Sequence, residues 1–180
     1  MDNDRKNEST VVKFPNPLLT KKCQEITKEA FSNEEDRAHL KEFVQAMSDT
    51  LDQTGGIGLA ANQVQVPKYE DMTIRVVIVK VENNKIVMIN PEVLNAEGKQ
   101  VGIEGCLSLP GVTEWMTRYQ QIKVKYLDID GNEQNIVAID QVASCVQHEM
   151  DHLDGLTMLN RMSRMKRDIW VRKMKKRGLI

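Results

Sequence analysis

Two histidines four residues apart, with a glutamate directly after the first, form the clearest chemical motif in this chain. They are His148, Glu149 and His152, and the apolar residues around them recur at helical spacing. Residues four apart lie one turn apart on the same face of a helix, so both imidazoles can reach one metal ion. Glu149 then projects beside that ion, where its carboxylate can accept a proton from water. The motif therefore predicts metal-assisted hydrolysis.

A catalytic metal site with three protein ligands needs one more donor besides the two imidazoles. In metzincin peptidases that donor is a His three residues after a glycine, but the matching place after Gly155 holds Met158. A thioether suits a hard divalent ion poorly, so metzincin chemistry is disfavoured. Cys106, in a short Gly-containing segment between strand-like stretches, is the obvious remaining candidate. Its thiolate would complete the ligand set and leave the fourth position for water.

The other two cysteines and the third histidine are given structural roles. Cys23 is expected to be a small buried apolar group, as free cysteines usually are. Cys145 lies three residues before His148 on the same helical face, so we expect it to line the site rather than to bind the metal. His39 falls on the predicted solvent side of an earlier helix. Three widely spaced cysteines argue against a disulfide framework and favour a reducing compartment, which we expect to be the cytoplasm.

Three helices are predicted to position this chemistry. Asp140 is expected to cap the helix of the motif, and Gly155 stands where a left-handed residue would end it. An earlier amphipathic helix should open with a capping box of Ser32 and Glu35 and stop at a pair of glycines. A last helix should run from about Ser163 onward, with Met162, Met165, Ile169, Trp170 and Met174 as its apolar stripe.

Two β-hairpins are predicted between the early amphipathic helix and the helix of the motif. Residues 74–81 and 85–89 are rich in Val and Ile on either side of a short polar turn. Residues 122–126 alternate cleanly and are followed, after an Asp-Gly turn, by residues 135–139. We therefore expect one α+β domain over residues 11–180, with antiparallel β-sheets packed around a central metal-binding helix and a helix towards each end. The first ten residues are expected to form a flexible tail.

Composition restricts the partners of the whole molecule. At 180 residues the chain can bury the core of one domain without disulfides. Its 25 basic and 26 acidic residues give a net charge of -1, which offers no overall attraction for DNA or for an anionic membrane. No apolar run approaches the length of about 20 residues that spans a bilayer. We therefore expect neither DNA nor membrane binding.

Three segments together resemble the signature motifs of peptide deformylases, in that family's order and spacing. They are Gly-Ile-Gly-Leu-Ala-Ala-Asn-Gln at 56–63, Glu-Gly-Cys-Leu-Ser at 104–108, and Gln-His-Glu-Met-Asp-His-Leu-Asp-Gly at 147–155. A looser similarity extends from about Val11 to the end of the chain. The resemblance implies a metal ion held by the cysteine of the second segment and both histidines of the third, which are Cys106, His148 and His152.

The same resemblance implies roles for the surrounding residues. Glu149 would act as general base and then as general acid. The Gln63 amide and the Leu107 backbone N–H would bind the developing oxyanion, which suits the chemistry because donors aimed at one oxygen stabilise a tetrahedral intermediate. The family also pairs the substrate backbone, as an added strand, with the positions of Ile57, Gly58 and Gly105, and glycines allow that close approach.

The reaction implied is hydrolysis of the formyl group from the N-terminal formylmethionine of new polypeptides, with release of formate. The residues alone indicate only metal-assisted amide hydrolysis. Members of the family favour Fe²⁺ in the cell and usually work with Ni²⁺ or Co²⁺ and less well with Zn²⁺, and two imidazoles with a thiolate accept any of these. The segment from Arg161 to Arg177 contains nine basic residues and one acidic residue, Asp168. This charge is expected either to form an ordinary solvated helix face or, in addition to the catalytic function, to make a weak contact with ribosomal RNA.

Two departures from the family pattern concern the pocket. Gln141, Ser144 and Thr113 stand where relatives often have aliphatic or basic residues, so the cavity for the methionine side chain is expected to be more polar or differently shaped. Trp115 lies in an unusual stretch and is expected either to cap the substrate groove or to pack on a loop.

Two rival functions remain open. A thermolysin-like peptidase shares the histidine motif but takes a downstream carboxylate as its third ligand, so replacement of Cys106 separates the two. A peptide-binding module that has lost catalysis would need neither Glu149 nor Gln63, and both are present.

Overall fold

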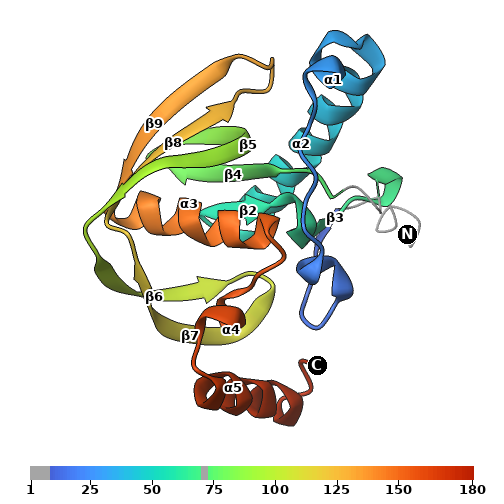
Figure 1. Ribbon diagram of the computed structural model, residues 1–180. Helices are drawn as coiled ribbons and strands as arrows, with labels where there is room; N and C mark the ends of the chain where they lie inside the picture. The colour runs from blue at the N-terminus through green and yellow to red at the C-terminus, as the bar shows by residue number, and fades with distance from the viewer. Residues whose placement is uncertain (1–8, 70–72) are drawn as a thin grey trace.

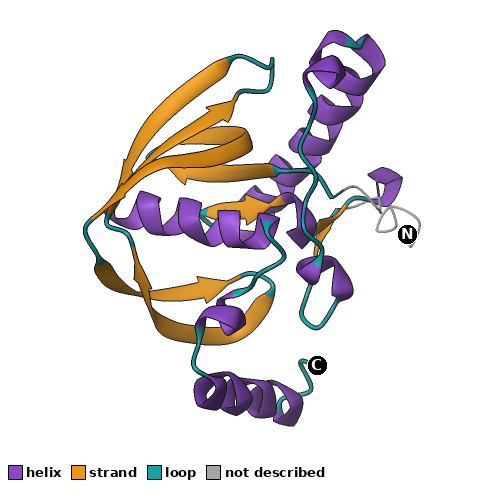
Figure 2. Cartoon of the chain, in the orientation of Figure 1, coloured by secondary structure: helices purple, strands orange, loops and turns teal. Residues whose placement is uncertain are grey.

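Helix α3 (Asp140–Leu153) lies between two antiparallel β-sheets in the computed structural model, which describes residues 9–69 and 73–180 (Figure 1). The strands are β1 (Thr10–Val11), β2 (Gly58–Ala60), β3 (Val64–Gln65), β4 (Val76–Val81), β5 (Asn84–Glu97), β6 (Gln100–Cys106), β7 (Leu109–Arg118), β8 (Gln121–Leu127) and β9 (Glu133–Ile139). The helices besides α3 are α1 (Lys28–Ser32), α2 (Glu34–Thr54), α4 (Met158–Arg161) and α5 (Arg164–Lys176), with short 3-10 turns at Pro17–Thr20, Ala61–Gln63 and Pro67–Tyr69. Figure 2 shows α1 and α5 at opposite ends of the molecule.

The larger sheet has five strands in the order β2-β4-β5-β8-β9, and every neighbouring pair is antiparallel. Its strand β4 contains a run of four buried aliphatic side chains, because both faces of the sheet are covered there. Val77 and Val79 pack with α3. Val76 and Ile78 point to the opposite face and pack with α2. This sheet forms one wall of the space that contains the motif helix.

The smaller sheet, the β6–β7 hairpin, forms the opposite wall (Figure 1). Its inner face packs on the C-terminal helices, since Val112 and Met116 share a cluster with Leu159 and Met174. Among the described strands, β6 pairs only with β7 and β2 pairs only with β4. The edge of β6 that faces away from β7, and the edge of β2 that faces away from β4, are therefore free to accept another strand.

The predicted α+β architecture and both predicted hairpins are confirmed. The first hairpin is β4–β5 and the second is β8–β9, although β5 continues well beyond the predicted end. Gly155 adopts the expected left-handed conformation, with φ +72°. Ser163 caps α5, because its side chain accepts a hydrogen bond from the backbone N–H of Lys166.

Three local predictions are wrong. Helix α2 is capped not by Ser32 but by Asn33, whose side chain accepts hydrogen bonds from two backbone N–H groups in its first turn. Asp140 is the first helical residue of α3 rather than its cap, and its carboxylate instead accepts from the Gln120 amide at 3.1 Å. Met165 and Ile169 do not belong to the packed stripe of α5 and are 70% and 39% exposed. A third hairpin, β6–β7, was not predicted at all.

Most of the predicted tail over residues 1–10 cannot be compared with the structure. Its first eight positions lie outside the described residues. Thr10 begins β1, where it pairs with Gln65. Within the described ranges, no helix has the length and apolar character needed to cross a membrane.

Candidate metal centre and active site

Cys106, His148 and His152 come together in the space between α3 and β6. One ligand atom from each of them lies within 4.8 Å of the others, and the Cys106 Sγ is 3.3 Å from the His152 Nε2. Both histidines are buried on the same face of α3, and Cys106 is half-buried at the end of β6. A thiolate and two imidazoles at this separation can hold one divalent transition metal ion. The donor set therefore fits the metal that the sequence predicts.

The second ring nitrogen of His148 is held by a carboxylate. Glu104 Oε2 lies 2.9 Å from His148 Nδ1, and the Arg118 guanidinium binds both Glu104 oxygens at 2.8 and 2.9 Å. Burial alone would raise the pKa of Glu104, but hydrogen bonds from Arg118 and His148 outweigh it and lower that pKa to about 2. An ionised carboxylate only accepts, so His148 donates from Nδ1. Burial alone would lower the pKa of His148, but hydrogen bonds with Cys106 and Glu104 raise it well above its usual range, so a proton leaves Nε2 when a metal ion binds.

His152, unlike His148, already has the neutral ring that binds metals. Burial lowers its pKa to about 3, so its ring is neutral near pH 7. It has no exposed surface, and Asn62 donates a hydrogen bond to its backbone oxygen at 2.5 Å. The backbone of the α3 C-terminus is thus fixed against the turn that follows β2.

Asp151 extends the charge network behind the candidate metal ligands. Its carboxylate accepts a hydrogen bond from Arg118 Nη1 at 2.6 Å. The Arg161 guanidinium from α4 also donates to it. Arg118 is 6% exposed and Asp151 7%, so each charge depends on its partners for stabilisation. The network joins β6, β7, α3 and α4 around one buried arginine.

Glu149 lies beside the ligands with a carboxylate free to act. It is buried, and its Oε2 has no hydrogen-bond partner among the described residues. Burial raises the pKa of Glu149 to about 7. A carboxyl group with such a pKa can take and return a proton near neutral pH.

Gln63 presents its amide N–H₂ towards the same space. Its Oε1 accepts the backbone N–H of Ala60 at 2.9 Å, which fixes the orientation of the amide. Its Nε2 lies 3.2 Å from Ser108 Oγ and 3.6 Å from Cys106 Sγ. Gln63 is 1% exposed, so it is a preorganised donor rather than a mobile one.

An open cavity of about 460 Å³ connects these groups to solvent. Its lining includes the remaining residues singled out from the sequence, which are Ile57, Gly58, Gly105, Leu107, Cys145, Thr113, Gln141 and Ser144. The cavity lies between the free edges of β2 and β6, with the first turns of α3 as its floor. Gln141 and Ser144 belong to that floor, and Thr113 also lines the cavity.

Gly58 and Gly105, the two glycines of this cavity singled out from the sequence, differ in the room around them. A Cβ added at Gly58 would lie 2.5 Å from Glu149 Oε1 and 2.6 Å from Cys145 Sγ. A Cβ added at Gly105 would meet only ordinary contacts, at 3.7 Å or more. Gly58 is therefore needed by the packing of the site itself. Cys145 forms part of the wall, with its Sγ 3.5 Å from the Ile57 carbonyl oxygen.

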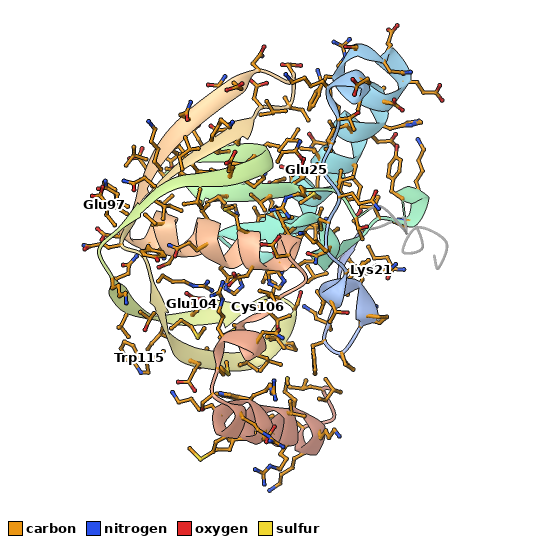
Figure 3. The ribbon with its side chains drawn as sticks, in the orientation of Figure 1. Lys21, Glu25, Glu97, Glu104, Cys106 and Trp115 are labelled. Atoms are coloured by element: carbon orange, nitrogen blue, oxygen red, sulfur yellow. The ribbon has the colours of Figure 1, made fainter. Side chains whose placement is uncertain are left out.

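Three residues discussed from the sequence lie outside the cavity. Cys23 is buried in the core, as predicted. His39 packs edge-on against Tyr69, with ring centroids 5.9 Å apart. Trp115 lies in β7 rather than on a loop, is 61% exposed, and does not line the cavity (Figure 3).

The charge network around Arg118 was not predicted from the sequence. Glu104 and Asp151 lie inside the motif segments but were given no role, and Arg118 was not singled out. The available signal was the strand period of β7, because Arg118 falls two residues after the buried Met116 and so on the same inner face. Figure 3 shows Glu104 and Cys106 in the space between α3 and the β6–β7 hairpin.

Comparison with known proteins agrees with this geometry. The sequence model of the polypeptide deformylase family matches residues 8–168. Among curated relatives, the peptide deformylase of Stenotrophomonas maltophilia is 40% identical over 174 residues, covering 92% of this chain and 94% of the relative. That of Caldanaerobacter subterraneus is 38% identical over 152 residues, covering 84% and 87%.

Solved structures give the same answer. The peptide deformylase of Legionella pneumophila superposes with a TM-score of 0.80 at 29% identity, covering 93% of this chain and 94% of that one. The enzyme of Ehrlichia chaffeensis has a TM-score of 0.79 at 32% identity, covering 94% and 96%. The chain therefore belongs to the polypeptide deformylase family, the metal-dependent hydrolases that remove the formyl group from the N-terminal formylmethionine of polypeptides.

Proposed function

We propose that this hydrolase holds one divalent metal ion with Cys106, His148 and His152 and that Glu149 moves the protons. When bound, the ion supplies Lewis acidity, which makes water a better nucleophile and stabilises developing negative charge. The observation that supports the site is the convergence of three ligand atoms within 4.8 Å beside a buried, unpartnered carboxylate. We further propose Fe²⁺ as the ion used in the cell, with Ni²⁺, Co²⁺ or Zn²⁺ able to replace it, since this mixed nitrogen and sulfur set accepts all four.

Glu149 acts first as general base and then as general acid. Its carboxylate takes a proton from the attacking water. The proton then passes to the leaving amine, which departs as a free N-terminus while formate is released. The raised pKa of Glu149, about 7, suits both steps because the group is neither too weak a base nor too weak an acid near neutral pH.

Gln63 and Leu107 stabilise the oxygen of the formyl group as it becomes negative. The Gln63 amide is locked with its donor side towards the cavity, because its oxygen is occupied by the Ala60 N–H. The Leu107 backbone N–H, next to Cys106, would supply a second donor. Two donors fixed before the reaction need no reorganisation when charge develops.

The peptide binds as an extended strand between the free edges of β2 and β6. Ile57, Gly58 and Gly105 line the cavity at these two edges, and Cys145 forms its wall. Backbone pairing on both sides would hold a peptide of any sequence, which suits an enzyme for many substrates. A related structure, the enzyme of Acinetobacter baumannii, is described as bound to Met-Ala-Ser, and we propose that this cavity takes the same kind of peptide.

The direct test is formate release from formyl-Met-Ala-Ser by protein purified without oxygen, compared with cleavage of unformylated peptides. We expect rapid formate release and no peptide-bond cleavage. Cleavage of unformylated peptides would instead support the thermolysin-like reading. Glu149→Gln is the matched control, because it keeps the shape of the site and removes the base.

A second, separate proposal concerns where the enzyme works. The basic side chains of α5 are exposed, whereas its apolar residues Trp170, Val171 and Met174 pack on the β6–β7 hairpin. We propose that this basic face makes a weak, salt-sensitive contact with ribosomal RNA in the cytoplasm, which brings the enzyme to nascent chains. Replacing Lys173, Lys175 and Lys176 by Glu should weaken co-sedimentation with ribosomes and leave turnover of a short formyl-peptide unchanged. Unchanged co-sedimentation would leave α5 as a solvated helix.

A further inference from the structure

The outer face of the β6–β7 hairpin carries an exposed apolar surface that the reaction does not explain. Val101 is 62% exposed, Ile103 63% and Trp115 61%. Ile103 and Trp115 are directly paired across the two strands, so their side chains lie on the same face. Figure 3 shows Trp115 on the outside of the hairpin, away from α3. Large apolar side chains gathered in this way on a surface usually mark a binding site.

This surface is continuous with the active-site cavity. Ile103 lines the cavity and also forms half of the exposed pair with Trp115. Ile103 lies on β6, whose last residue is the proposed ligand Cys106. A peptide whose formyl end is at the metal site can follow the free edge of β6 in only one direction, away from Cys106 and towards Gln100, because β6 ends at Cys106.

The distance along β6 identifies which residue of the peptide arrives there. Ile103 lies three positions before Cys106, about 10 Å at the rise of an extended strand. In an antiparallel pairing, if the first peptide residue is opposite Cys106, the fourth is opposite Ile103, and opposed residues share a face. The second residue would be opposite Gly105, which has no side chain to contact it.

We propose, resting on the function above, that Ile103 and Trp115 form a subsite for the fourth residue of the formyl-peptide and that this subsite favours a large apolar side chain. The occupant is thus the substrate itself, because the surface begins inside its cavity. The Trp115 ring lies one strand beyond Ile103 and extends the apolar contact outward. Partial burial of one leucine side chain there should raise kcat/KM about fivefold.

The test compares formyl-Met-Ala-Ser-Leu with formyl-Met-Ala-Ser-Ser. The unaltered protein should prefer the leucine peptide about fivefold, and Trp115→Thr should abolish most of that preference. Moving the leucine to the third position should give a peptide whose turnover does not respond to Trp115→Thr. Val137→Thr is the matched control, since Val137 is 52% exposed on β9, in the other sheet, and its replacement should leave the preference intact.

A second measurement does not depend on turnover. Binding of the unformylated product Met-Ala-Ser-Leu should shift the tryptophan fluorescence of the protein to shorter wavelength, Met-Ala-Ser-Ser should shift it much less, and Trp115→Thr, which retains Trp170, should show neither shift. Equal turnover of the two formyl-peptides, or a preference that persists in Trp115→Thr, would overturn the subsite. Self-association of the protein that Trp115→Thr abolishes would assign the surface to a second copy of the chain instead. Absence of turnover with both peptides would contradict the proposed function rather than this inference.

Discussion

Gly58→Ala should disable the enzyme by displacing Glu149, its proposed general base. The added Cβ would lie 2.5 Å from Glu149 Oε1, and ordinary contact begins at 3.4 Å, so the carboxylate must retreat by about 0.9 Å. It cannot be relieved from the other side, because Cys145 Sγ would lie only 2.6 Å from the same Cβ. Misplacing a catalytic group by about 1 Å costs on the order of 100-fold in rate.

The assay is kcat for formate release together with metal content and melting temperature. We expect Gly58→Ala to retain its metal, since the ligands lie on other residues, and to lose about 100-fold in kcat. Gly102→Ala makes the same chemical change on β6, where the added Cβ meets nothing within 4 Å, and should behave like the unaltered protein. A Gly58→Ala protein within threefold of normal kcat would refute the proposed position of Glu149.

Three other predictions test separate parts of the site. Glu149→Gln should keep the metal and lose about 100- to 10,000-fold in turnover, because an amide cannot accept the proton; activity within tenfold of normal would remove Glu149 from the mechanism. Gln63→Leu should lower kcat about 100- to 1,000-fold, and a change in KM alone would assign Gln63 to substrate binding instead. Burial raises the pKa of the Cys23 thiol to about 11, so Cys23 stays protonated at pH 8 and should resist iodoacetamide while metal-free protein is alkylated at the half-buried Cys106, which mass spectrometry of the two peptides would show.

The motif helix was predictable because its chemistry is local. The spacing of His148 and His152 places both rings on one face of a helix, and no other part of the chain is needed for that conclusion. The third ligand, Cys106, was not predictable from local spacing and was inferred by asking which other side chain could bind a metal ion. The two confirmed hairpins were predictable for the same local reason, since their strands alternate or are rich in Val and Ile around short turns.

Strand β6, and with it the β6–β7 pairing, was not predictable from its pattern. Strand β6 contains two glycines, and its apolar Val101 and Ile103 face solvent while Glu104 faces His148, so its pattern indicates the wrong buried face. The network around Arg118 was hidden for another reason. Its partners Glu104 and Asp151 are 14 and 33 residues away along the chain, and only the packing of the hairpin on α3 brings them together.

The cap of α2 failed on a smaller point. Ser32 and Asn33 are adjacent and both are good capping residues, so the sequence could not distinguish them. Helix α1 ends at Ser32, which leaves Asn33 as the residue with extended backbone that a cap requires.

The central claim is that Cys106 completes the metal site, and metal analysis of Cys106→Ser tests it most directly. Protein and variant would be purified without oxygen, loaded with Ni²⁺ and titrated with a chelator while bound metal is measured. Because a hydroxyl is a far poorer anionic ligand than a thiol near neutral pH, the variant should lose most of its metal affinity while keeping its fold. A Cys106→Ser protein that still binds one metal ion per chain with normal affinity would contradict the proposed ligand set and return a downstream carboxylate as the third ligand.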